Sequence, residues 1–74
     1  MAKADERPIA TLWQLALNDD RLSCTIYRHE NGFQLRVESA TTVILTEPVE
    51  LQPRMFARTQ ALRASLKRRG WKES

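Results

Sequence analysis

Glycine, proline and cysteine are scarce in this 74-residue chain, which contains two, three and one of them. The two glycines, Gly32 and Gly70, cannot supply a phosphate-binding glycine loop or a dinucleotide fingerprint. The single cysteine, Cys24, excludes an internal disulfide, and with the single histidine, His29, it excludes a zinc site built from Cys and His side chains of one chain. We therefore expect no metal and no cofactor.

Long apolar runs are also missing. They reach only three residues, as in Val43-Ile44-Leu45, whereas a membrane-spanning helix needs about 20. Residues 1–8 lack the apolar core of a secretion signal. With 42% apolar and 28% charged residues the composition is that of a small globular domain. We expect a cytoplasmic protein with a flexible leader over residues 1–8, one domain over residues 9–74, no membrane partner and no small-molecule substrate.

Alternation of apolar and polar residues predicts a β-hairpin in the first third of the chain. Two alternating runs flank the turn-rich segment 18–21, and taking Asp19-Asp20 as a two-residue loop puts the six large apolar side chains of the two runs on one face. The predicted cross-strand pairs are Leu17 with Leu22, Leu15 with Cys24, and Trp13 with Ile26.

Two further strands follow. The Asn31-Gly32 dipeptide is a strong turn signal, and an even number of loop residues puts Phe33, Leu35 and Val37 on the face of the first hairpin. A fourth strand is expected over residues 42–47, with Pro48 ending it. Which side of this strand faces the core is undecided, because either the Val43 row or the Ile44 row could point inward.

Near residue 52 the period changes to that of a helix of about 17 residues. Pro53 suits its first position, and Gly70 suits a left-handed cap that turns Trp71 back onto Leu66. One apolar stripe, which Phe56 widens, is formed by Met55, Thr59, Leu62 and Leu66.

These elements predict an α+β fold, ββββα. A four-stranded antiparallel meander should form one layer, and one C-terminal amphipathic helix should pack on one face of it as the second layer. The expected core consists of Trp13, Leu15, Cys24, Ile26, Leu35, Val37, Met55, Leu62 and Leu66.

The residue types that could carry catalysis fit structural roles better. Cys24 lies on the apolar row of a strand, where a thiol behaves as a small hydrophobe. His29 falls in a turn with no nucleophile beside it, and Asp19 and Asp20 are explained by turn chemistry. We expect no enzyme and name no catalytic residue.

The charge is unevenly distributed. Residues 1–50 carry five basic and eight acidic side chains, and residues 51–74 carry seven basic and one acidic. The basic helix predicts either a solubilising rim around the apolar stripe or phosphate contacts with nucleic acid, to which the outer sheet face could add an aromatic platform. The candidate nucleic-acid contacts are Arg54, Arg58, Arg63, Lys67, Arg68 and Arg69 on the helix, and Tyr27 and Arg36 on the sheet.

A row of small residues on the back of the helix offers a different function. Ala57, Ala61 and Ala64 lie opposite the apolar stripe, where they either serve helix propensity or let another helix approach closely. Together with open sheet edges and the spare apolar Ile44, they are candidate dimer contacts. We expect a small non-enzymatic protein-interaction or homodimeric module, with non-specific nucleic-acid binding through the basic helix as the alternative.

The order of elements resembles two known arrangements: the plant ethylene-response type of DNA-binding domain, and the single-strand-binding transcriptional coactivators in which four strands and a helix dimerise. The first reads the major groove with outward Arg and Trp residues on its strands, whereas this chain offers only Arg36 there. The likeness is one of element order without shared motif residues, so we assign no family.

Overall fold

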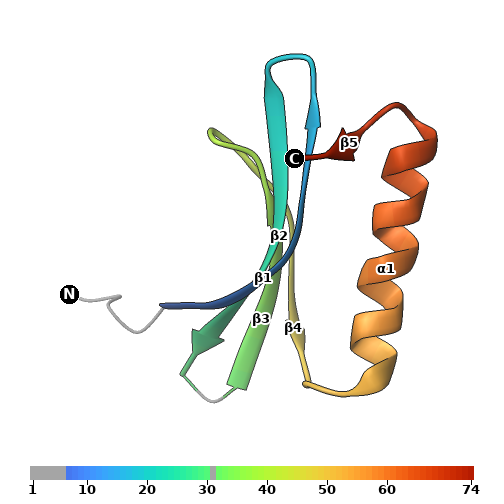
Figure 1. Ribbon diagram of the computed structural model, residues 1–74. Coiled ribbons are helices and arrows are strands. Elements are labelled where there is room, and N and C mark those ends of the chain that lie inside the picture. The colour runs from blue at the N-terminus through green and yellow to red at the C-terminus, as the bar shows by residue number, and fades with distance from the viewer. Residues whose placement is uncertain (1–6, 31) are drawn as a thin grey trace.

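The structure is a computed structural model that describes residues 7–30 and 32–74, in which one sheet and one helix are formed. The elements are β1 (Arg7–Leu17), β2 (Asp20–His29), β3 (Gly32–Glu38), β4 (Val43–Val49), α1 (Pro53–Arg68) and β5 (Lys72–Glu73). The strand order is β4-β3-β2-β1-β5 with every neighbouring pair antiparallel, and α1 lies along one face of the sheet (Figure 1). The α+β class is confirmed, but the sheet has five strands instead of four because β5 adds to the edge of β1.

The first hairpin has the predicted facing but not the predicted register. Leu17 pairs with Asp20, so the loop residues are Asn18 and Asp19 rather than Asp19 and Asp20. Asn18 has a φ of +56°, in the left-handed region that Asn tolerates better than most residues. Leu15 consequently faces Leu22 instead of Cys24. The pairing has moved by two residues, and a shift of two keeps each side chain on its own face.

β1 is longer than expected and irregular. It begins at Arg7, so Arg7 and Pro8 of the expected leader pair with β2, and the remainder of that leader lies outside the described residues. The register shifts twice, at Ile9 and at Leu12, where β1 holds one residue more than β2. Such bulges increase the local twist of a strand, and they bend the first half of β1 away from a flat edge.

The facing of β3 is confirmed, and that of β4 is now resolved. Leu35 lies opposite Ile26, as the even loop requires, and Leu45 lies opposite Val37 on the same core face. Ile44 is the extra residue at a register shift and is 59% exposed. Pro48 does not end the strand but pairs within it; this is tolerated because β4 is an edge strand and needs no donor on its open side.

The helix ends in the expected glycine cap. The Gly70 N–H donates to the Lys67 carbonyl at 3.1 Å and the Trp71 N–H to the Leu66 carbonyl at 3.1 Å, which is the Schellman pattern. Gly70 has a φ of +109°. This reversal sends the last residues back to the sheet, where they form β5 beside β1.

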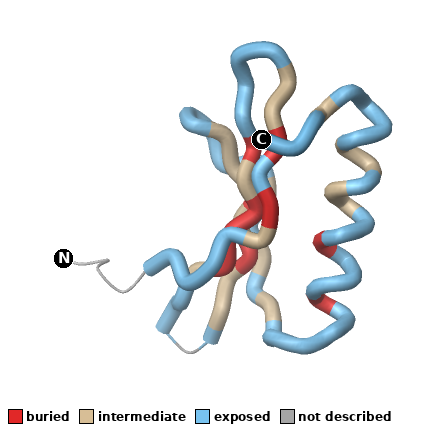
Figure 2. The backbone as a smooth tube through the Cα atoms, viewed as in Figure 1, coloured by how far each residue is buried: buried red, intermediate tan, exposed pale blue. Residues whose placement is uncertain are grey.

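The core lies between α1 and the helix-facing side of the sheet (Figure 2). The Trp13 indole N–H donates to the backbone carbonyl of Thr59 at 3.1 Å, and this hydrogen bond is buried. Two differences from the expected core concern α1: Leu62 and Leu66 are only half-buried, and Phe56 is exposed rather than part of the stripe. The buried apolar residues are Trp13, Leu15, Leu22, Cys24, Ile26, Leu35, Val37 and Met55.

Replacing Trp13 by Phe should destabilise the protein by about 1–3 kcal/mol, because the Thr59 carbonyl then loses its indole donor in a buried site. Urea unfolding measures the change. Trp71→Phe is the matched control, since Trp71 is half-buried and its change leaves the bond between sheet and helix intact. Equal losses in the two variants would show that aromatic packing alone, and not this bond, holds α1 in place.

The two glycines should respond differently to alanine. Gly70→Ala should cost about 1–2 kcal/mol, because its φ of +109° strains an L residue even though the new Cβ would stand 3.6 Å from Leu17 Cδ1, an ordinary contact. Gly32→Ala should be close to neutral, since its Cβ would meet nothing within 4 Å. Thermal unfolding of both variants tests this, and a loss at Gly32 as large as that at Gly70 would contradict it.

Candidate binding surfaces

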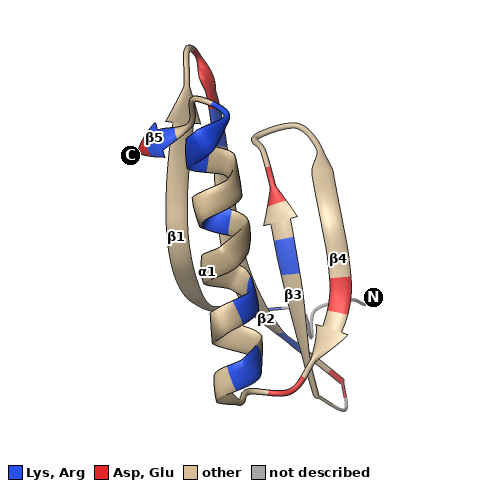
Figure 3. Cartoon of the chain, turned by 90° about the vertical axis from the view of Figure 1, so that its right-hand side faces the viewer, with Lys and Arg blue, Asp and Glu red and all other residues tan. Residues whose placement is uncertain are grey.

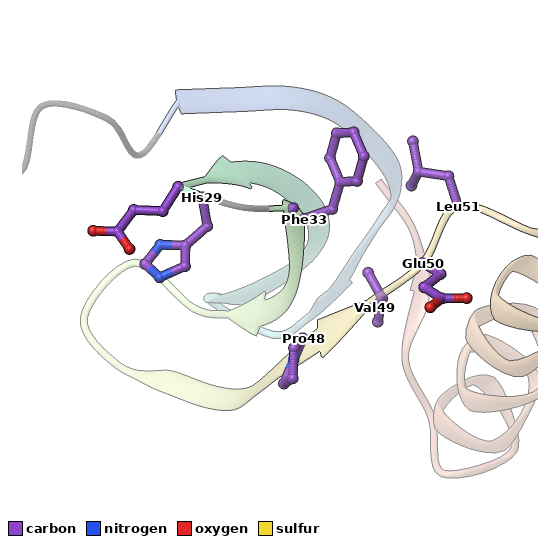
Figure 4. A pocket seen from close by; sticks show the side chains of 8 residues that line it. His29, Phe33, Pro48, Val49, Glu50 and Leu51 are labelled. Atoms are coloured by element: carbon purple, nitrogen blue, oxygen red, sulfur yellow. The ribbon is translucent and has the colours of Figure 1, made fainter.

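The side chains considered for catalysis lie on different parts of the sheet: Cys24 is buried within β2, His29 ends β2, and Asp19 and Asp20 lie at the first hairpin turn. An open depression at the end of β2 and β4 is lined by His29, Phe33 and Leu51 among others, and Figure 4 shows His29 and Glu50 at opposite ends of it. Burial raises the pKa of the Cys24 thiol to about 11, so it stays protonated at neutral pH. Within residues 7–30 and 32–74, no group of three His, Cys, Asp or Glu side chains could hold a metal ion.

Three of the six predicted helix cations are held by carboxylates of the sheet. Arg58 Nη2 donates to Glu47 Oε1 of β4 at 2.9 Å. On the other flank of α1, Arg63 pairs with Glu73 of β5, and Lys67 Nζ lies 3.1 Å from the same carboxylate. The pairs are partly exposed, with Arg58 63% and Glu47 22% accessible, so solvent screens them and they contribute little to stability. Arg58, Arg63 and Lys67 are thus engaged by carboxylates of the sheet on the two flanks of α1.

The other three helix cations have no such partner. Arg54, Arg68 and Arg69 are exposed and make no ion pair within the described part of the chain. Figure 3 shows basic segments along α1, with a concentration at its C-terminal end and in β5. The hydrogen bond from Lys67, supported by Arg63, holds the pKa of the Glu73 carboxyl below its usual range. That carboxylate is therefore already engaged by two cations.

The two sheet residues proposed for nucleic acid interact with each other. The Arg36 guanidinium lies 4.1 Å from the centroid of the Tyr27 ring and donates to Gln34 Oε1 at 2.7 Å. The Tyr27 hydroxyl donates to Glu38 Oε2 at 2.6 Å. One face of the ring is covered and its hydroxyl is engaged, so Tyr27 offers a base less stacking surface than its outward position predicts.

The candidate dimer contacts lie on two separate surfaces. Ala57, Ala61 and Ala64 are exposed on α1, whose other face buries Met55 and Thr59 against the sheet. Ile44 stands in β4, beside Val43, and the two are 59% and 49% exposed. The structure does not bring the alanine row and Ile44 into one interface.

The open sheet edges are poorly suited to adding another strand. β4 carries Pro48 and the extra residue Ile44, β1 carries the extra residues Ile9 and Leu12, and β5 is two residues long. Proline, bulges and short strands are the features by which edge strands avoid pairing with other chains. Contacts through exposed side chains are therefore favoured over backbone pairing.

In the part of the chain that the structure describes, no helix has both the length and the apolar character needed to cross a membrane.

Comparisons with known protein families, curated proteins and solved structures found no match.

The Tyr27 hydroxyl should titrate above its ordinary pKa of about 10, because deprotonation would break its bond to Glu38 and put two anions side by side, and partial burial adds to the effect. Tyr27 is the only tyrosine in the chain, so the phenolate absorbance reports it alone. Glu38→Gln should lower this pKa. A phenol that titrates equally in the native protein, this variant and the unfolded chain would contradict the bond.

The raised pKa of Tyr27 determines how the free energy of unfolding changes with pH. The contribution of the protonated Tyr27 hydroxyl is fully present below the unfolded pKa of about 10 and is lost as the pH rises through the higher folded value. Tyr27→Phe should abolish this part of the alkaline loss of stability.

Proposed function

We propose that this protein is a small non-enzymatic interaction module of the cytoplasm that binds protein, in the simplest case a second copy of itself. The observation that carries the proposal is the pair Val43 and Ile44, two adjacent large apolar side chains that are about half exposed. Apolar side chains grouped on a surface favour contact with another apolar surface. Burying one such side chain contributes about 1.5–3 kcal/mol.

The way in which β4 is built indicates how this contact would form. Ile44 is the extra residue at the register shift with β3, so it departs from the regular alternation of the strand. Pro48, further along β4, limits the length over which a second backbone could pair. The proposed contact therefore uses the side chains at the start of β4, not an extension of the sheet.

The outward face of α1 is a second, independent contact under the same proposal. Ala57, Ala61 and Ala64 place small side chains on this face, which lets a partner helix come close beside them. Because the core stripe of α1 is occupied by the sheet, this face is available without unfolding the domain.

Ile44→Ser should weaken self-association at least tenfold, since the variant loses the burial of one large apolar side chain. Sedimentation equilibrium over a wide concentration range measures the dissociation constant. Ile9→Ser is the matched control, because Ile9 is exposed to a similar degree, 49%, on β1.

The helix face is tested in the same experiment. Ala61→Glu places a charge in the alanine row and should separate a dimer that uses α1. A wild-type protein that stays monomeric throughout would overturn self-association, and equal effects of Ile44→Ser and Ile9→Ser would remove Ile44 from the interface.

A further inference from the structure

The apolar face of the sheet extends past the part that α1 covers. Phe33 lies on the same side of β3 as Leu35, which is buried in the core, and Val49 of β4 lies directly opposite Phe33. Phe33 and Val49 pack against the core but are only half-buried. Leu51, in the connection from β4 to α1, is 46% exposed and lines the same depression as these two side chains. We call Phe33, Val49 and Leu51 the end patch.

The depression that the end patch lines carries more negative than positive charge. Glu30, directly after β2, and Glu50, directly after β4, line it together with His29. Among the described residues, no Lys or Arg lines it. Figure 4 shows Glu50 on the side of α1 and His29 on the side away from the helix. Two carboxylates outweigh one imidazole in either protonation state, so this apolar site is acidic in a chain whose net charge is +3.

The two carboxylates of the depression make no ion pair within residues 7–30 and 32–74. Glu30 and Glu50 both belong to exposed residues. Arg54 of α1 lines a neighbouring depression together with Glu50, but the two side chains form no ion pair. Glu47 and Glu73, in contrast, are held by cations of α1. The carboxylates of the depression are therefore available to a cation from another molecule.

The apolar patch and the negative charge together select the kind of partner. Carboxylates repel phosphate groups, which disfavours nucleic acid and anionic membranes. An apolar surface favours an apolar side chain, which a metal ion or a purely basic segment does not supply. Small molecules bind in concave sites that bury most of their surface, whereas this depression is open. It suits a side chain that a partner protein presents.

We infer that the depression binds a segment of a partner protein in which a large apolar side chain is flanked by Lys or Arg. The apolar side chain packs on the end patch, and the neighbouring cations pair with Glu30 and Glu50. The site lies at the end of β4, whereas Val43 and Ile44 lie at its start. The inference therefore does not depend on self-association through those two residues.

Selection from a random peptide library displayed on phage tests the preference directly. The full chain is immobilised, and the library is sequenced before and after selection. Enriched peptides should combine a large aliphatic or aromatic residue with Lys or Arg within a few positions, and Asp and Glu should be depleted, because both the apolar patch and the carboxylates contribute to binding. Enrichment of apolar residues without Lys or Arg, or no enrichment at all, would overturn the inference.

Reversing the charge of the depression should reverse the preference. Glu30→Lys/Glu50→Lys retains the end patch and should select peptides in which Asp or Glu flanks the apolar residue. Asp19→Lys/Asp20→Lys is the matched control, because it changes the net charge equally at exposed residues near the opposite end of β2. Far-UV circular dichroism establishes that both variants are folded. The inference fails if the first variant still selects basic peptides or if the control also changes its preference.

The apolar part of the site is tested with a labelled peptide selected on the wild-type protein. Leu51→Ser should weaken its binding by about tenfold or more in fluorescence anisotropy, because the end patch loses its most exposed side chain. Ile44→Ser should bind the peptide as the wild type does, since Ile44 lies at the other end of β4. Equal losses in the two variants would contradict the inference.

Sedimentation equilibrium of the same two variants separates this inference from the proposed self-association. Ile44→Ser removes an apolar side chain of the proposed self-contact and leaves the depression unchanged, so either proposal can fail while the other holds. Self-association that is lost in Leu51→Ser would overturn a separate partner and assign the depression to a second copy of this chain.

Discussion

The buried hydrogen bond between Trp13 and Thr59 joins the two layers of this protein, and the orientation of α1 depends on it. The apolar face of the sheet must be buried against another element, and here a single helix, α1, packs on it. The Trp13 indole reaches the backbone of α1 instead of a side chain, while the Thr59 hydroxyl donates to the Phe56 carbonyl at 2.9 Å. Both polar groups are thus satisfied without water, so the helix can approach the sheet closely at this point. At this contact the side of α1 that carries Met55 and Thr59 is turned toward the sheet.

That orientation sorts the helix cations into two kinds. With Met55 and Thr59 facing the sheet, Arg58 reaches Glu47 on one side, and Arg63 and Lys67 reach Glu73 on the other. These cations lie at the edge of the core, where the aliphatic parts of such side chains cover apolar surface. Arg54, Arg68 and Arg69 make no ion pair with a carboxylate of the described sheet. The same orientation of α1 therefore pairs one group of cations with the sheet and leaves the other group exposed.

Much of the fold follows from the alternation of residues in the sequence, because alternation determines which face a side chain takes whatever the register. Asn18, Asp19 and Asp20 all have turn chemistry, so the sequence does not say which two of them form the loop, and an error of one loop position leaves every face unchanged. β5 is different. Two residues show no periodicity, and this strand exists because the glycine reversal delivers Lys72 and Glu73 to the edge of β1.

The sequence predicts that the candidate binding residues lie on the surface, but it does not predict which other side chains they contact. Helical spacing places Arg58 and Arg68 on the outside of the same helix, yet one pairs with a carboxylate on β4 and the other with none in the described chain. The difference lies in contacts between residues distant in sequence, which periodicity does not contain. Tyr27 and Arg36 show the same limit, since outward facing predicts a platform and their mutual stacking largely occupies it. The availability of a charge therefore depends on its neighbours in the fold.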